Sequence, residues 1–462
     1  MSRFCISKSR FLKLALAVCF STAAWAGTFG KVVSIGGHAS DLALDEARGV
    51  LYVANFTANR VEVVSLADHS ILRSMNVAAQ PASLALSPDG KFLVVTHFGN
   101  FTAPNSPNNA ITVVNLVTGS RQTFGAGSPP LGVAFGLDNR AFIATQNDFV
   151  LFDPVSGSTE LLDSVTGLVS KTLPQPLGTA PAQIVATSMA VSGDGVTIMG
   201  VSDKFYFRYD SVRKFLSIVG YTSSPPDGPR AVSVNRDGTR WMSGWALKEQ
   251  SGWSRSMLPN PTGSLNIGSV MIDSFRDLVY AQIEETGVTG ATLQVLDGDN
   301  LTVRERLNLR ENLSGKSVMS SDGSTVYSVS DSGVTVLPVG SLYAAPRVMA
   351  SRSELSFRGN FCDRNIASQE VSIVSEGASA DFRITSDNPG VRISPSSGTT
   401  PATVRISVDP SSFQNQKGTV AVNLKIESTR GVNQASPIRV LINSREPDQR
   451  GNVIPVAGKL VD

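Results

Sequence analysis

A unit of short apolar strands separated by tight polar turns recurs seven times between residues 37 and 339. In its clearest copy an alternating strand at 41–45 is followed by a turn at 48–49, a second strand at 50–55 and a third at 61–64. Successive copies lie 39 to 56 residues apart. A unit of this kind cannot bury its apolar faces alone, so neighbouring copies must pack against one another. The chain is therefore constrained to an all-β array of repeated sheets.

The turns between the first two strands of each copy carry the strongest local signal. Six of them are Asp-Gly or a near equivalent, residue types that accept a positive φ in a two-residue hairpin. The turns lie at Arg48-Gly49, Asp89-Gly90, Asp138-Asn139, Asp194-Gly195, Asp237-Gly238, Arg276-Asp277 and Asp322-Gly323. Their spacing is near the ~40–50 residues of a four-stranded propeller blade. We therefore predict a seven-bladed β-propeller at residues 29–345.

The chain ends suggest how this ring closes. The last copy has a third strand at 333–337 but no clear fourth strand, and the first copy is preceded by an unassigned strand at 31–35. We predict that the strand at 31–35 is the outermost strand of the seventh blade, which covers edges that would otherwise invite aggregation.

One stretch of the first copy resembles a known family of repeats. Residues 51–55, Leu-Tyr-Val-Ala-Asn, followed by Asn59, Arg60 and Val61, are similar to the hallmark strand of bacterial YVTN-type (YncE-like) β-propeller repeats. The resemblance covers roughly residues 29–345, and blades four and five are degenerate. Some lactonases share this scaffold, so the resemblance also leaves a hydrolase open.

Composition excludes several partners. The formal net charge is only +2, charged residues make up 17% of the chain, and no basic run is interleaved with aromatic residues. These values argue against nucleic acid and against an anionic membrane surface as partners.

The N-terminus has the pattern of an export signal. Basic residues up to Lys13 precede a short apolar stretch at 14–24, which is too brief to span a bilayer, and Ala24-Trp25-Ala26 offers a cleavage site before Gly27. We predict a signal peptide at 1–26 and a secreted or periplasmic bacterial protein without a membrane span. A lipoprotein alternative would use Cys19. After cleavage near Ala26 only Cys362 remains, so no internal disulfide is expected.

The region after residue 339 has a different strand pattern from the repeats. Strand candidates follow one another at 354–357, 371–374, 381–384, 391–393, 402–408, 418–426 and 438–442. Seven alternating strands in about 95 residues are typical of an immunoglobulin-like β-sandwich. We predict such a domain at 350–446.

The stretch 392–408, followed by 417–419, resembles BACON-type bacterial immunoglobulin-like modules. This resemblance implies either contact with carbohydrate or a role as a spacer. The spacer is favoured because no aromatic platform for a sugar ring is evident. The phenylalanines of the region, Phe357, Phe361, Phe382 and Phe413, are expected in the core.

The tail at 447–462 resembles the opening of the propeller. Residues 453–462 align without a gap to residues 32–41, with apolar positions and the terminal Gly and Asp in common. Either this is a chance β-rich tail, or it is the first strand of a truncated second propeller.

Catalytic signals are weak. Three histidines, His38, His69 and His97, follow the proposed signal peptide without metal-ligand spacing, and the Ser- and Gly-rich motifs are blade turns. We predict no catalytic residue, no metal and no cofactor. The alternative is an extracytoplasmic lactonase-like hydrolase at the channel mouth, with candidates Asp41, Arg230, Glu284 and Lys316.

Two insertions are the best candidates for recognition, because long loops on a rigid scaffold concentrate binding residues. They lie at 98–109 in blade two and 245–261 in blade five, and we predict that both are on one propeller face. The ligand-binding candidates are Phe98, Phe101, Arg230, Trp253, Arg255 and His97. The predicted function is non-catalytic binding or scaffolding, in which this face recognises an envelope protein or a polysaccharide; the oligomeric state is left open.

Overall fold

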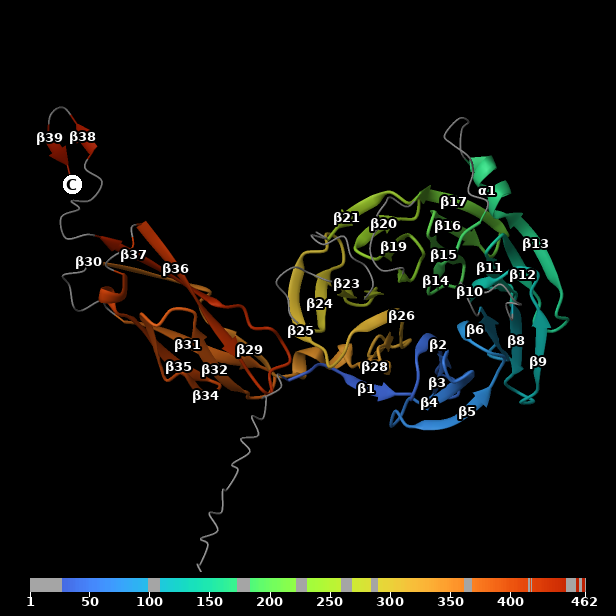
Figure 1. Ribbon diagram of the computed structural model, residues 1–462, viewed down its shortest axis with the longest axis horizontal. Helices are drawn as coiled ribbons and strands as arrows, with labels where there is room; N and C mark the ends of the chain where they lie inside the picture. The colour runs from blue at the N-terminus through green and yellow to red at the C-terminus, as the bar shows by residue number, and fades with distance from the viewer. Residues whose placement is uncertain are drawn as a thin grey trace, which may run out of the picture.

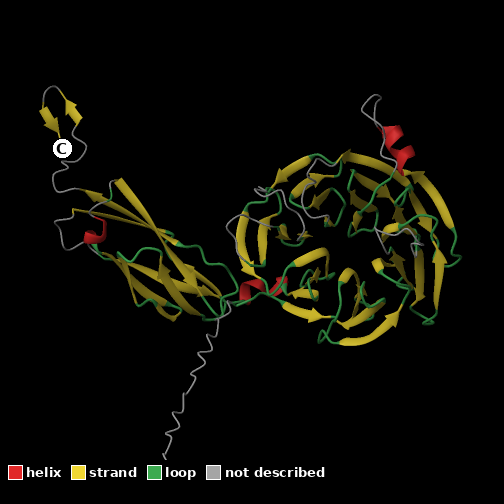
Figure 2. Ribbon diagram, viewed as in Figure 1, coloured by secondary structure: helices red, strands yellow, loops and turns green. Residues whose placement is uncertain are grey.

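The computed structural model describes residues 27–98, 109–172, 183–221, 231–258, 268–283, 290–360, 368–413, 416, 418–445, 454–456 and 459–461. The regular secondary structure of these residues is almost all β-strand (Figure 2). The helical elements among them are α1 (Val165–Thr172) and the 3-10 helices η1 (Val339–Ala344) and η2 (Pro410–Phe413). The all-β prediction is confirmed.

Seven four-stranded antiparallel sheets of the described residues form the blades of a β-propeller, arranged in a ring (Figure 1). Blades one to three are β2 (Ala39–Asp45), β3 (Val50–Asn55), β4 (Arg60–Ser65), β5 (Ile71–Asn76); β6 (Pro81–Leu86), β7 (Phe92–His97), β8 (Ala110–Asn115), β9 (Arg121–Gly125); and β10 (Pro130–Phe135), β11 (Ala141–Thr145), β12 (Asp148–Phe152), β13 (Thr159–Ser164). Blades four to six are β14 (Thr187–Val191), β15 (Thr197–Ser202), β16 (Phe205–Asp210), β17 (Phe215–Tyr221); β18 (Val232–Val234), β19 (Arg240–Ser243), β20 (Ala246–Glu249), β21 (Ser254–Met257); and β22 (Ser269–Asp273), β23 (Leu278–Gln282), β24 (Thr292–Asp297), β25 (Val303–Asn308). Blade seven combines β26 (Leu313–Met319), β27 (Val326–Ser330) and β28 (Gly333–Leu337) with β1 (Lys31–Ser34).

The seventh blade closes the ring as the sequence predicts. Strand β1 pairs antiparallel with β28, with Val33 opposite Val334. Val33 is buried against residues of blades one and seven. The N-terminal strand therefore joins the two ends of the propeller.

The predicted turns are present, with a correction to their length. The second residue of each predicted turn has a positive φ, including the non-glycine residues Asn139 and Asp277. The loops are longer than the predicted two residues, however: Asp45 pairs with Val50, which leaves four residues between them. Four-residue hairpin loops built on a type I turn accept the same residue types, so the sequence signal does not distinguish the two lengths.

Strand direction defines two ends of the ring. We call the end that holds the loops between first and second strands, and between third and fourth strands, the turn end. The crossover end holds the loops between second and third strands and the links between blades. Backbone bonds join the two kinds of loop at the turn end: the Leu66 N–H donates to the Gly49 carbonyl at 2.9 Å, and the Gln250 N–H to the Thr239 carbonyl at 2.8 Å.

The core lies mainly between adjacent blades, where apolar side chains of neighbouring sheets pack together. Blades three and four are joined by aromatic rings: Phe142 stacks on Tyr209 with centroids 4.7 Å apart, and Phe149 meets Phe207 at 5.0 Å. Gly200 lies opposite Phe207 across β15 and β16. A Cβ atom at Gly200 would approach the Phe207 ring to 2.1 Å, so glycine is needed there to admit the ring.

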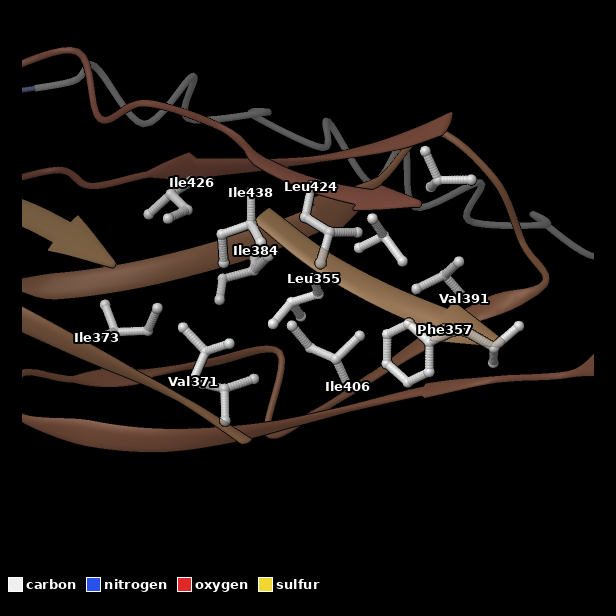
Figure 3. Close-up of a cluster of buried hydrophobic side chains, with 14 of the residues drawn as sticks. Leu355, Phe357, Val371, Ile373, Ile384, Val391, Ile406, Leu424, Ile426 and Ile438 are labelled. Carbon is white, nitrogen blue, oxygen red and sulfur yellow. The ribbon is translucent and has the colours of Figure 1, made fainter. Parts of the chain in front are cut away.

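Two further sheets follow the propeller and share one hydrophobic core (Figure 3). One sheet has the order β29 (Arg347–Ala350), β31 (Gln369–Glu376), β35 (Ala402–Val408), β33 (Val391–Ser394). The other has the order β30 (Glu354–Asn360), β37 (Ile438–Arg445), β36 (Gly418–Glu427), β32 (Asp381–Ser386), β34 (Ser397–Thr399). All seven predicted strands of this region are present, and β29 and β34 are additional. Phe357, Phe382 and Phe413 are buried in the core as predicted, whereas Phe361 lies outside the described residues.

The C-terminal sheets contact blade six. The segment 432–434 runs along the outer strand β25: the Asn308 N–H donates to the Val432 carbonyl at 2.7 Å, and the Gln434 N–H to the Arg306 carbonyl at 2.8 Å. The buried Arg347 of β29 also pairs with Glu305 of β25 at 2.9 Å. The segment thereby covers part of the edge of β25, which would otherwise be an unpaired outer strand edge.

Strands β38 (Ile454–Val456) and β39 (Lys459–Val461) pair with each other as a separate hairpin. The predicted tail at 447–462 otherwise lies outside the described residues. No helix within the described ranges is both long and apolar enough to cross a membrane.

Candidate functional site: the central channel and the turn end

The inner strands enclose a cavity of about 540 Å³ on the propeller axis. All seven innermost strands contribute to it, mainly through apolar residues such as Leu44, Leu86, Phe135, Val191 and Met319. Small side chains, Ala43, Ala85, Ala134 and Ala190, recur at equivalent positions of blades one to four and leave room on the axis. Residues of the first turns reach its mouth, so the cavity lies toward the turn end.

An ion pair lies on the crossover side of this cavity. The Nζ atom of Lys316 in β26 is 3.2 Å from Oδ1 of Asp41 in β2. Asp41 also accepts hydrogen bonds from the Ser83 hydroxyl at 2.6 Å and from the Leu84 N–H at 2.9 Å. The structure thus brings together two of the four predicted channel-mouth candidates. Arg230 and Glu284 lie outside the described residues.

Serine hydroxyls extend this pattern of bonds between neighbouring inner strands. Ser83 accepts from the Val133 N–H at 3.3 Å, and Ser233 accepts from the Ile272 N–H at 2.9 Å. The hydroxyls of Ser269 and Ser317 are 2.5 Å apart. Asp41 and these serines therefore hold adjacent blades together, a role that the sequence pattern does not reveal.

The histidines are in three different settings. His38 and His97 lie at the crossover end in neighbouring blades. His38 contacts Phe56 edge-on with centroids 6.4 Å apart. His97 is fully buried at the end of β7, with Nδ1 3.1 Å from the Ala79 carbonyl, and its Nε2 has no hydrogen-bond partner within the described part of the chain. Burial lowers the pKa of His97 to about 4. His69 lies at the opposite, turn end, in the loop between β4 and β5.

The predicted blade-two insertion falls mostly outside the described residues, and Phe101 with it. Phe98, directly after β7, is half-buried at the crossover end. Among the described residues, no group of three or more His, Cys, Asp or Glu side chains is arranged to hold a metal ion.

The prediction that the two insertions share one face is wrong. The segment 245–258 is not one loop, because it contains the short strands β20 and β21, and Trp253 lies in the loop between them. That loop is at the turn end, since the Glu249 N–H bonds the Trp253 carbonyl at 2.9 Å and Gln250 bonds Thr239. Trp253 and Arg255 are therefore at the opposite end of the propeller from His97 and Phe98.

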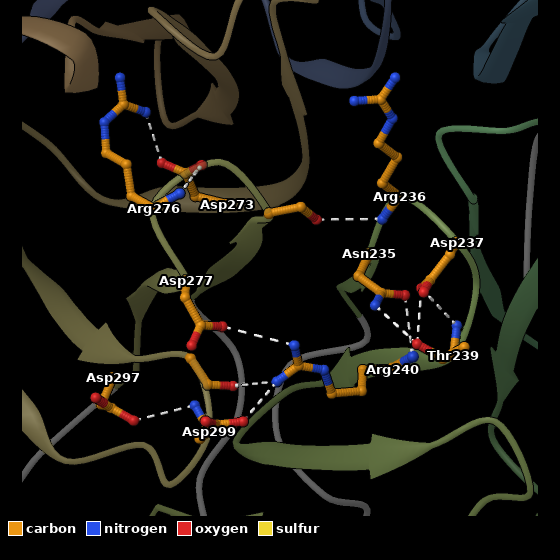
Figure 4. A network of polar contacts seen from close by, with 12 residues as sticks. Asn235, Arg236, Asp237, Thr239, Arg240, Asp273, Arg276, Asp277, Asp297 and Asp299 are labelled. Carbon is orange, nitrogen blue, oxygen red and sulfur yellow. Dashed lines mark hydrogen bonds and ion pairs between the residues drawn. The ribbon is translucent and has the colours of Figure 1, made fainter.

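Arg255 belongs to a network between blades five and six, in which Arg240 and Asp299 can be followed in Figure 4. Its guanidinium pairs with Glu249 at 3.0 Å and with Asp299 at 3.2 Å. Arg240 of β19 reaches the same Asp299 carboxylate at 2.8 Å. The side chain predicted as a contact anchor is thus engaged in joining two blades.

The turn end carries an arc of exposed apolar side chains, of which only Trp253 was predicted from the sequence. They occupy the loops between third and fourth strands in four successive blades. The exposed fractions are 69% for Val117, 76% for Val155, 65% for Val212 and 79% for Trp253. We call these four residues the apolar arc. Val117, Val155 and Val212 each stand two residues after an Asn or Asp that ends a strand or directly follows it, a spacing that could have predicted the arc.

The charged turn residues bond within their own loops. Asp322 accepts from the Ser320 hydroxyl at 2.6 Å and from the Ser324 N–H at 2.9 Å. These bonds, that of the Ser320 side chain first, lower the pKa of Asp322 to about 2. Asp194 accepts from Ser192 and from the Val196 N–H in the same way. Most turn carboxylates are therefore committed to shaping the loops.

Comparisons with known proteins agree with the fold. No protein-family model matches the chain. Antigen Lp49 of Leptospira interrogans serogroup Icterohaemorrhagiae serovar copenhageni (strain Fiocruz L1-130) is 30% identical over 104 residues, which cover 20% of this chain and 22% of that protein. The chain thus matches less than a quarter of that relative.

Among solved structures, the WD40 repeats of RRP9 align with a TM-score of 0.50 and 12% identity over 68% of this chain and 98% of theirs. Hydrazine synthase of Kuenenia stuttgartiensis aligns with a TM-score of 0.49 and 15% identity, over 68% of this chain and 98% of that one. The likeness to the WD40 repeats shows the fold alone: this chain contains a β-propeller.

Proposed function

We propose that this protein is an exported binding protein of a bacterial envelope, and that the turn end of its propeller recognises an envelope protein. The observation that carries the proposal is the apolar arc, in which four successive blades each expose a large apolar side chain. Exposed apolar surface of this kind is typical of protein interfaces, and tryptophan is a frequent energetic anchor in them. A polysaccharide is less favoured because sugar rings stack on aromatic platforms, and the arc contains one aromatic residue.

We also propose a repeat type for the propeller and a module type for the C-terminal sheets. The propeller would be of the YVTN type, and the two C-terminal sheets would form an immunoglobulin-like, BACON-type spacer. The contacts of Arg347 and of segment 432–434 with blade six support a spacer held firmly against the propeller. Export rests on the basic and apolar pattern of residues 1–26.

The hydrolase alternative finds less support in the channel. An acid and a base must be free to exchange protons with a substrate. Asp41 and Lys316 instead bond each other, and Asp41 also bonds the backbone and a hydroxyl of blade two.

The experiment compares the purified chain from residue 27 with a Trp253→Ala/Val212→Ser variant in capture assays on envelope protein fractions and on a glycan array. Leu161→Ala, which alters an exposed apolar residue of the outer strand β13, is the matched control. We expect saturable binding of an envelope protein that is lost in the arc variant and kept in the control. Glycan binding lost in the arc variant would make a polysaccharide the partner. Retention of all binding by a folded arc variant, or turnover in a lactone hydrolysis screen, would overturn the proposal.

A further inference from the structure

The mouth of the channel at the turn end combines an apolar interior with a positive charge. Arg236 and Lys316 carry the charge among the residues that line the cavity. Lys316 is neutralised by Asp41. Arg236 is exposed, and among the described residues its guanidinium has no hydrogen bond or ion pair (Figure 4). Among the described residues that line the cavity, Arg236 is thus the one cation without a partner, and it lies at the entrance.

The turn that carries Arg236 differs from the turns in which an arginine is paired. In blades one and six an aspartate ends the inner strand and pairs with the arginine three residues later. Asp45 pairs with Arg48, and Asp273 pairs with Arg276, both at 2.8 Å. In blade five the equivalent residue is Asn235, whose side chain bonds Thr239 and the Arg240 N–H instead. Gly238, and not an arginine, stands three residues after Asn235, and Arg236 follows Asn235 directly, so this turn lacks the aspartate–arginine pair of blades one and six.

Arg236 has two small neighbours at the mouth, Ser274 and Gly193. The Arg236 N–H donates to the Ser274 hydroxyl at 3.2 Å. A Cβ atom at Gly193 would lie 3.1 Å from Cγ of Arg236, so the glycine leaves space for the arginine stem. Phe275, also at the mouth, is 54% exposed. The nearby acids are engaged: Asp237 accepts from Thr239, and Glu46 accepts from the Ser321 N–H.

We propose that this mouth binds a small amphipathic carboxylate, with its carboxylate on the Arg236 guanidinium and its apolar chain inside the channel. A guanidinium offers two parallel donors that match a carboxylate. Ligand pockets typically enclose about 300–1,000 Å³ and are mostly apolar with a few polar groups that fix orientation. The cavity of about 540 Å³ falls in this range. This site is distinct from the apolar arc and does not depend on a protein partner.

The test measures calorimetric binding of hexanoate, octanoate and decanoate to the purified chain from residue 27, with decanol and decyltrimethylammonium as the uncharged and cationic probes. We expect saturable binding that strengthens with chain length and is weak or absent for the two non-anionic probes. Arg236→Gln should weaken decanoate binding about tenfold or more, as loss of a charge-assisted hydrogen bond requires.

Two further variants keep the test specific. Arg213→Gln alters another exposed arginine at the turn end and should leave decanoate affinity unchanged. Val191→Trp places bulk in the cavity and should abolish binding in a chain whose circular dichroism is unchanged. No saturable decanoate binding, or equal affinity of wild type and Arg236→Gln, would overturn the proposal. Loss of envelope-protein capture in the arc variant with intact decanoate binding would confirm that the two sites are separate.

Discussion

The Nζ atom of Lys316 lies 3.2 Å from a carboxylate oxygen of Asp41, and this pair joins the innermost strands of the last and the first blade. Asp41 is nearly buried, and its second carboxylate oxygen holds blade two through Ser83 and Leu84. One carboxylate thus links three consecutive blades around the point where the chain closes its ring.

Asp41→Asn should destabilise the propeller more than Lys316→Met does. The asparagine keeps the shape but loses the charge, and its NH₂ group would face donors, so we expect a loss of about 2 kcal/mol in the free energy of unfolding. Lys316 is a quarter exposed, so its replacement should cost less than about 1 kcal/mol. Urea denaturation of both variants tests the ranking, and a larger loss for Lys316→Met would contradict it.

The sequence predicts much of this fold because its signals are local. Positive-φ residue types mark each first turn, and alternating apolar residues mark the strands on either side. Closure of the ring by β1 can also be predicted, because the unassigned strand at 31–35 supplies the fourth strand that the seventh blade lacks. The same reasoning predicts the seven strands after residue 339.

The sequence fails where pairing is decided by tertiary contacts. Strands β20 and β21 read Ala-Leu-Lys-Glu and Ser-Arg-Ser-Met, which are too short and polar to be recognised. Treating 245–261 as one loop placed Trp253 at the wrong end. The unpaired state of Arg236 among the described residues is equally hidden, because it depends on tertiary contacts that engage nearby acids, such as that between Glu46 and the Ser321 N–H.

His97 should make stability depend on pH. Burial lowers its pKa to about 4 in the folded chain from an ordinary value of 6.5. Between these values the unfolded chain binds more protons, so folded-state stability falls as pH drops from 6.5 to about 4 and changes no further below that. At about 1.4 kcal/mol per pK unit the loss is about 3 kcal/mol.

The measurement is urea unfolding of wild type and His97→Gln at pH 7.5, 5.5 and 4.5. Other groups titrate equally in both proteins, so the difference between the two curves isolates His97. The advantage of wild type over the variant should shrink steadily as the pH is lowered. Parallel curves would show that His97 is accessible to protons in the folded chain.

Gly200→Ala should disturb the contact between blades three and four. The added Cβ atom would lie 2.1 Å from the Phe207 ring, which is packed against Phe149. Displacing a ring in a packed core costs about 1–3 kcal/mol. Gly125→Ala is the matched control, because Gly125 also lies in a propeller strand and a Cβ there meets nothing within 4 Å. Thermal melts should show a lower midpoint for Gly200→Ala alone; equal midpoints would mean that the ring has room to move.

Val33→Asp should open the ring. Val33 is buried between blades seven and one within β1, and an aspartate there would be placed among the apolar side chains of this cluster. Burial of an unpaired charge costs several kcal/mol, so we expect a loss of about 3 kcal/mol or more in the free energy of unfolding. Ser34→Asp, an exposed change in the same strand, should alter it by less than about 0.5 kcal/mol. Because β1 pairs with β28, Val33→Asp should also speed hydrogen exchange at residues 333–336, whereas the outer strand of blade three should be unaffected. If both variants unfold at the same urea concentration, β1 does not hold the ring closed in solution.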